Sequence, residues 1–174
     1  MRRTEYAMST RDEEFQEFMR NRASTLHQSA YLLCGDWHLA DDLVQDTFIK
    51  AYRHWPRIRG MDIPDAYVRR ILVNEVRGRW RRRMRVIPVA RFPEGREQTV
   101  PDATEAFTQQ AGMLQILITL PLRQRATIVL RYLEGMSERE TADVLGCSVG
   151  TVKSQSARAL ATLRKALDRT ESTL

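Results

Sequence analysis

Basic and small polar side chains share one face of a predicted helix near the C-terminus. Residues 148–163 read SVGTVKSQSARALATL, and Lys153, Ser154 and Arg158 recur there at helical spacing, with Gly150 and Ala157 beside them. Lysine and arginine neutralise phosphates, and small neighbours let a helix come close to base edges in a major groove. The face is a candidate surface for reading duplex DNA, a chemistry in which no covalent bond is made.

Two predicted helix starts and one tight turn position this face. Ser137 and Glu140 have capping-box spacing, which predicts a helix from 138 that ends at Gly146. Ser148 then caps the second helix, whose apolar positions from Val149 onward are expected to pack on the first. The pattern is typical of a helix-turn-helix, although an ordinary helical hairpin with a solvated polar face shows it too.

A second candidate surface lies on a helix that should begin near Pro64. Between residues 69 and 85 there are eight arginines and a single acid, Glu75. A solvated charge run is normally mixed in sign, so this helix is expected to produce a positive field that attracts phosphates. One face of the helix is predicted to carry Arg70, Asn74, Arg77 and Arg81.

An acidic face is predicted on the preceding helix, which Asp36 caps and Pro56 ends. Asp42, Gln45 and Asp46 are spaced i, i+3 and i+4, which places them side by side. Their spacing alone is equally consistent with a solvated helix surface.

Composition limits the classes of function. The chain has 174 residues, a net charge of +6 and a pI near 9.8, which favours an anionic partner. Cys34 and Cys147 lack metal-ligand spacing, so we expect no zinc site and no disulfide, and both are expected to be small buried side chains. No catalytic motif, cofactor motif or bilayer-length apolar segment occurs, which predicts a cytoplasmic, non-enzymatic protein without membrane insertion.

Apolar periodicity predicts an all-α fold with two helical domains. A capping box at Thr10 and Glu13 should start the first helix, and Trp55 and Trp80 fall on inward faces of later ones. Residues 84–104 lose periodicity and contain Pro88, Pro93, Gly95 and Pro101, a composition expected of a flexible linker.

After this linker the helical pattern resumes. Asp102 and Glu105 are expected to cap one helix, and Pro121 is expected to start another that carries the apolar residues Ala126, Val129, Leu130 and Leu133. These helices would support the helix-turn-helix.

Three ordered segments resemble a bacterial RNA polymerase sigma factor of the extracytoplasmic-function class, closest to the actinobacterial SigE family. They read DDLVQDTFIKAYRHW, DAYVRRILVNEVRGRWRRR and LPLRQRATIVLRYLEGMSERETADVLGCSVGTVKSQSARAL. The resemblance implies that residues 12–83 form region 2, residues 84–104 a linker and residues 105–170 region 4. It also implies three partners: core RNA polymerase, through the clamp helices of its largest subunit and its flap region, promoter DNA, and an anti-sigma factor as a further candidate.

The resemblance also assigns roles to residues of this chain. Binding of core polymerase falls on Asp42, Gln45 and Asp46. Recognition and melting of the minus 10 element fall on the loop residues Asp62 and Ile63 and on Arg70, Asn74, Arg77 and Arg81, with Asn74 in the pocket for a flipped base. Reading of the minus 35 element falls on Thr151, Lys153, Ser154, Gln155 and Arg158.

Two other classes of function are weighed against this one. A stand-alone helix-turn-helix regulator would need neither the acidic face nor the arginine helix, and it would usually carry a dimerisation element, which the sequence lacks. A small nucleic-acid enzyme would need a catalytic constellation, which is also missing. The sequence names neither the promoters nor the inducing signal.

Overall fold

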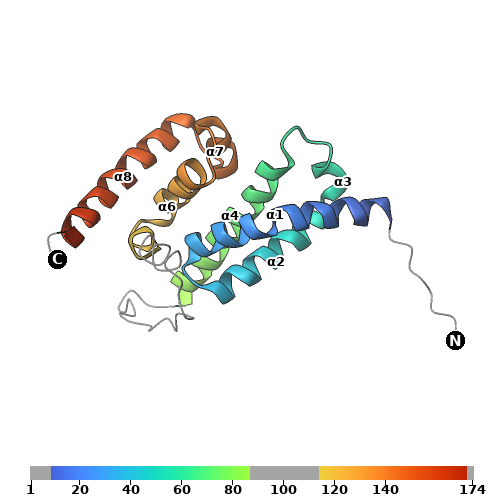
Figure 1. Ribbon diagram of the computed structural model, residues 1–174, viewed down its shortest axis with the longest axis horizontal. Helices are drawn as coiled ribbons and strands as arrows, with labels where there is room; N and C mark the ends of the chain where they lie inside the picture. The colour runs from blue at the N-terminus through green and yellow to red at the C-terminus, as the bar shows by residue number, and fades with distance from the viewer. Residues whose placement is uncertain (1–8, 87–113, 172–174) are drawn as a thin grey trace.

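The computed structural model describes residues 9–86 and 114–171, and every regular element in these ranges is helical (Figure 1). Most of the predicted linker and the predicted cap at Asp102 and Glu105 lie outside the described residues. The elements, in chain order, are α1 (Thr10–Cys34), α2 (Trp37–Arg53), α3 (Trp55–Ile58), α4 (Pro64–Val86), α6 (Leu122–Ile128), a π-helical turn η1 (Val129–Leu133), α7 (Glu138–Leu145) and α8 (Val149–Glu171).

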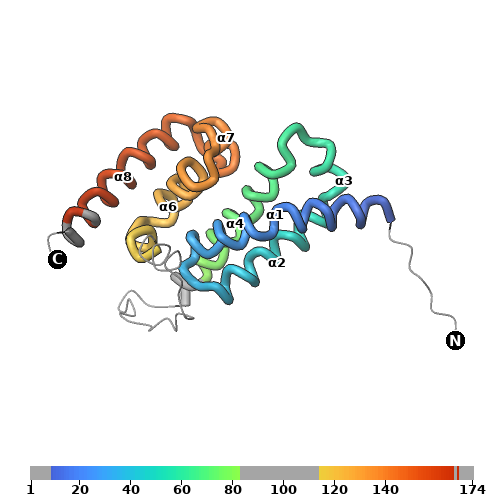
Figure 2. The backbone as a smooth tube through the Cα atoms, viewed as in Figure 1, coloured from blue at the N-terminus to red at the C-terminus, as the bar shows by residue number. Residues whose placement is uncertain are grey.

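The helices α1 to α4 form the first of two groups, which the tube view shows at the blue and green end of the chain (Figure 2). Leu43, Ile58 and Leu72 are fully buried at its centre. Aromatic rings fill the end of this core, where Phe15 meets Trp55 edge to face at a centroid distance of 5.1 Å. The predicted burial of Trp55 is therefore confirmed.

The starts and ends of these helices follow from local hydrogen bonds. The capping box of α1 is formed by Ser9 and Asp12, one residue before the predicted pair at Thr10 and Glu13, because the Ser9 side chain accepts the N–H of Asp12. Gly35 ends α1 in the left-handed conformation, at φ 77°.

The helices α6, α7 and α8 form the second group. The predicted capping box is present, since the Ser137 side chain accepts the N–H of Glu140 and the Glu140 side chain accepts that of Ser137. Gly146 ends α7 at φ 63°, and the Ser148 hydroxyl accepts the N–H of Thr151 at 3.1 Å. The helix-turn-helix predicted from these residues is confirmed.

A π-helical turn between α6 and α7 was not predicted. Across residues 129–133 the backbone opens to an i to i+5 pattern, and the Glu134 N–H donates to the Val129 carbonyl at 3.0 Å. Since π turns have the same apolar side chains as α turns, the sequence carries no distinguishing pattern. The turn determines where the Glu134 side chain points.

The two helical groups pack on each other, and the interface between them is called the seam. One hydrophobic core runs through both groups. Arg125 of α6 is buried in this seam and bonds only to backbone carbonyls among the described residues. It donates to the Leu33 carbonyl of α1 at 2.7 Å and to the carbonyls of Ile118 and Leu120 at 2.8 and 3.1 Å. Burial lowers the pKa of Arg125, and these three acceptors offset part of that cost.

Several predicted burials are wrong. Trp80 is 43% exposed, since burial in the described part of α4 ends at Val76. Leu133 and Val149 are also exposed, at the π turn and the first turn of α8. The predicted burial of the two cysteines is also wrong. Cys34 and Cys147 are only half-buried, although burial still raises the pKa of Cys34 to about 11.

Candidate nucleic-acid and polymerase surfaces

The predicted minus 10 surface lies on α4 and the loop before it. Asn74, Arg70 and Arg81 are exposed on one side of α4, and Asp62 and Ile63 are exposed in the loop. The exposed Asn74 amide offers both donors and an acceptor, which is the chemistry that pairs with the edge of an unstacked base. Arginines on the same face supply charge for phosphates.

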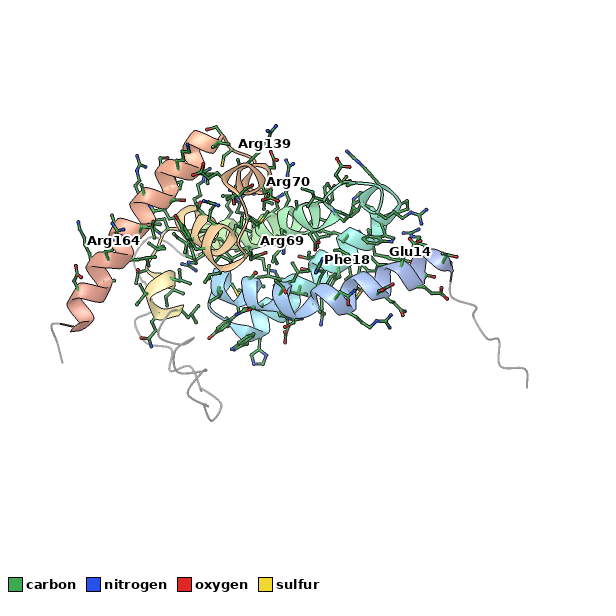
Figure 3. The ribbon with its side chains drawn as sticks, turned by 45° about the horizontal axis from the view of Figure 1, so that its top comes forward. Glu14, Phe18, Arg69, Arg70, Arg139 and Arg164 are labelled. Atoms are coloured by element: carbon green, nitrogen blue, oxygen red, sulfur yellow. The ribbon has the colours of Figure 1, made fainter. Side chains whose placement is uncertain are left out.

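Arg77, the remaining residue of this set, is turned partly inward. Its guanidinium donates to the carbonyl of Leu145 at 3.2 Å, at the C-terminus of α7. A helix C-terminus carries unpaired carbonyls and a partial negative charge, so a cation is favoured there. Burial, followed by the nearby charge of Arg123, lowers the pKa of Arg77. The helix-turn-helix therefore covers one edge of the predicted minus 10 surface, to which Arg70, labelled in Figure 3, belongs.

The predicted polymerase surface on α2 has a partner that the sequence did not reveal. Arg79 of α4 bonds to Asp46 at 2.8 Å and lies 3.4 Å from Asp42. The hydrogen bond from Arg79 to Asp46 is the main cause of the raised pKa of Arg79. One guanidinium thus offsets the repulsion between two like charges on adjacent turns, and Gln45 lies exposed beside them.

The predicted minus 35 residues divide into two sets. Lys153, Ser154 and Arg158 are exposed on the open face of α8. Thr151 and Gln155 are half-buried and line a pocket that Arg77 also lines. Only the first set is placed for direct contact with duplex DNA in this arrangement.

The sequence pattern does not predict the charged contacts of the seam. Glu134 has a side chain only 5% exposed, accepts a hydrogen bond from Ser29 at 2.7 Å and forms an ion pair with Arg69. These partners are 105 and 65 residues away from Glu134 in the sequence. A run of arginines indicates a phosphate-binding helix, and nothing local distinguishes the arginines that bind carboxylates within the chain.

Comparison with known families supplies the deciding observation. The family described as Sigma-70 region 2 matches residues 18–86, and the family described as Sigma-70, region 4 matches residues 111–163. The RNA polymerase sigma-E factor of Streptomyces avermitilis is 40% identical over 156 residues, which cover 89% of this chain and 86% of the relative. The chain belongs to the extracytoplasmic-function class of sigma factors.

Other relatives agree with this assignment. The sigma factor is 40% identical over 155 residues to the RNA polymerase sigma-E factor of Streptomyces coelicolor, covering 88% of this chain and 86% of the relative. It is 33% identical over 153 residues to the ECF RNA polymerase sigma factor SigM of Mycobacterium tuberculosis, covering 88% and 76%. The resemblance to the SigE family is confirmed, and with it a role in transcription initiation.

Solved structures show the same fold. CnrH in complex with the cytosolic domain of CnrY superposes with a TM-score of 0.66 at 28% identity, covering 90% of this chain and 89% of that one. The sigma factor RpoE in complex with the anti-sigma factor NepR from Bartonella quintana gives 0.69 at 25% identity, covering 90% and 98%.

The family match also decides between the classes of function considered above. A stand-alone helix-turn-helix regulator has no use for a region 2 domain, so the alternative is not favoured. Sigma factors are transcription initiation factors and not enzymes. No helix in the described part of the chain combines the length and apolarity that crossing a bilayer requires.

Proposed function

We propose that this sigma factor divides promoter recognition between two separate surfaces and polymerase binding on a third. Asn74 and the exposed arginines of α4 capture the melted minus 10 strand, and Lys153, Ser154 and Arg158 of α8 read the minus 35 duplex. Asp42, Gln45 and Asp46 of α2 bind the clamp helices of core polymerase. The observation that carries this proposal is an exposed amide within an arginine-rich face of α4, separate from the open basic face of α8.

The two DNA surfaces differ in chemistry. No covalent bond is made during promoter opening; unstacked bases bound at Asn74 draw the duplex toward its melted state by mass action. The arginines around Asn74 contact phosphates and add affinity without sequence information. Region boundaries at residues 12–83 and 105–170 follow from the same proposal, as does a cytoplasmic site of action beside the polymerase.

Transcription from a promoter library tests the proposed function. Purified core polymerase should start at new sites when this protein is added. Repression without new start sites would contradict the proposal and favour a regulator instead.

Replacing Asn74 with alanine should impair melting more than duplex binding. The loss of one base-edge contact is worth about 1–3 kcal/mol, which is about a 5- to 150-fold smaller open population. Permanganate footprinting measures the melted bases, and a gel shift measures binding to the closed duplex. Asn21→Ala, at an exposed asparagine of α1, is the control, and a normal bubble in Asn74→Ala would contradict the assignment.

Replacing Arg158 with alanine should weaken recognition of the minus 35 element. The expected loss is about 1–3 kcal/mol if the guanidinium contacts a base edge, and the effect should depend on the sequence of the element. Arg164→Ala removes the same charge at another exposed position of α8 and is the matched control. An electrophoretic shift that is indifferent to Arg158→Ala would exclude Arg158 from the interface.

The anti-sigma factor named with the solved RpoE structure suggests a further partner class. In that structure a protein of similar fold is in complex with the anti-sigma factor NepR. We therefore propose that an anti-sigma protein also binds this chain, and affinity capture with the full chain as bait tests it.

A further inference from the structure

A small pocket opens in the seam between the two helical groups. It has a volume of about 110 Å³ and is bounded by α4, α6, the end of α7 and the start of α8. Its lining residues are Arg77, Arg123, Thr127, Leu145, Gly146, Cys147, Thr151 and Gln155.

The pocket carries uncompensated positive charge. Arg77 comes from the first helical group and Arg123 from the second, and no carboxylate is among the lining residues that the structure describes. Neither arginine forms an ion pair with a described residue. The charges of Arg123 and Arg81 contribute to the lowered pKa of Arg77, which shows that the guanidinium groups repel one another.

The polar groups of the pocket suit an oxyanion. Arg77 uses one N–H on the Leu145 carbonyl, which leaves its other donors available. Thr151 and Gln155 add a hydroxyl and an amide from the first turns of α8, close to a helix N-terminus, whose dipole favours negative charge. Guanidinium groups bind phosphate with two parallel hydrogen bonds and great geometric preference.

Size restricts the ligand. Sites for drug-sized molecules and cofactors occupy about 300–1,000 Å³, so a pocket of about 110 Å³ suits a small anion better than a whole nucleotide. We propose that the seam pocket binds the phosphate group of a small anion, with Arg77 and Arg123 as its charged ligands.

Such binding would regulate the arrangement of the two groups. Since each group supplies one arginine, the pocket is complete only while the groups are packed together. A ligand that binds one arrangement stabilises it by mass action. Phosphate should therefore hold the packed arrangement and withdraw Arg77 from DNA.

Isothermal titration of inorganic phosphate into the full chain tests the proposal, at constant ionic strength with chloride as the reference anion. Binding should be detected for the wild type and should weaken by about tenfold or more in Arg123→Gln, because a charge-assisted contact is lost. Arg164→Gln removes the same charge from a part of α8 distant from the pocket and should bind phosphate like the wild type (Figure 3).

Thermal unfolding gives a second readout. Phosphate stabilises most proteins by exclusion from their surface, so the difference between variants is the quantity of interest. The rise in Tm should be larger for the wild type and Arg164→Gln than for Arg123→Gln. Equal responses in all three, or no binding by the wild type, would overturn the proposal. A wild type that ignores phosphate, with Arg123→Gln weakened only in DNA binding, would also overturn it by assigning the pocket to the DNA backbone.

Discussion

Reversing the charges of Asp42 and Asp46 together is expected to abolish binding to core RNA polymerase and to leave the helix content unchanged. A like-charge contact in an interface costs several kcal/mol, and a loss of about 3 kcal/mol weakens affinity by about 100-fold. Both carboxylates are substantially exposed, with side chains 61% and 43% accessible, so a basic partner can reach them beside Arg79. Pull-down with core polymerase measures the affinity, and circular dichroism the helix content.

The controls separate docking from folding. Asp41→Lys reverses a neighbouring charge on another face of α2, where the side chain is 57% exposed and its partner is His27. It should bind polymerase like the wild type. Asp42→Asn with Asp46→Asn keeps the shape of both side chains and should give an intermediate loss. Undiminished affinity of the charge-reversed protein would refute the docking surface.

Local signals predicted the helix-turn-helix accurately. The capping box at Ser137 and the left-handed Gly146 depend on residues within one or two turns, which a single sequence shows directly. The same holds for Pro64 at the first position of α4. The cap at Ser9 lies one residue earlier than predicted. Ser9 with Asp12 and Thr10 with Glu13 have the same spacing, and both pairs have side chains that can form a capping box.

Long-range contacts limited the prediction of the surfaces. The arginine run from Arg69 indicated one phosphate-binding face, yet in the structure its arginines have three different environments. Arg69 binds Glu134, Arg79 binds the acids of α2, and Arg70 remains exposed. Helical spacing gives the direction of each side chain but not the identity of the neighbour it meets. The predicted burial of Trp80 was wrong for the same reason. Its position on the apolar stripe does not show which part of the helix a neighbouring helix covers.

The seam has a consequence for promoter binding. The minus 10 and minus 35 elements are about 25 base pairs apart, which is about 85 Å of duplex at about 3.4 Å per base pair. In the packed arrangement α4 contacts α7, and Arg77 lies 3.2 Å from the Leu145 carbonyl. Because the proposed surfaces on α4 and α8 would have to contact elements this far apart, we expect the two helical groups to separate when both surfaces engage one promoter.

Glu134→Gln is expected to favour this separation. Removing one partner of a buried ion pair costs about 3 kcal/mol, because Arg69 then loses its buried counter-ion and keeps only Asp65, at 3.7 Å. This corresponds to about a 100-fold shift toward the open arrangement, in which Arg69 regains water. Small-angle scattering should show a larger radius of gyration, with unchanged helix content. Apparent affinity of the polymerase-bound protein for a promoter that carries both elements should rise, since the competent fraction of molecules rises.

A matched control variant and a less disruptive substitution make this test more specific. Glu138→Gln removes a charge from α7 at a site 38% exposed, where the contact to Lys153 is 3.7 Å, and should leave the scattering unchanged. Ser29→Ala removes only the hydroxyl that donates to Glu134, so its effect should be about 1 kcal/mol. If Glu134→Gln scatters like the wild type, the Arg69 pair does not hold the seam. The buried contacts of Arg125 with the Leu33 carbonyl would then be the principal restraint, and Arg125→Ala would be the variant that opens the chain.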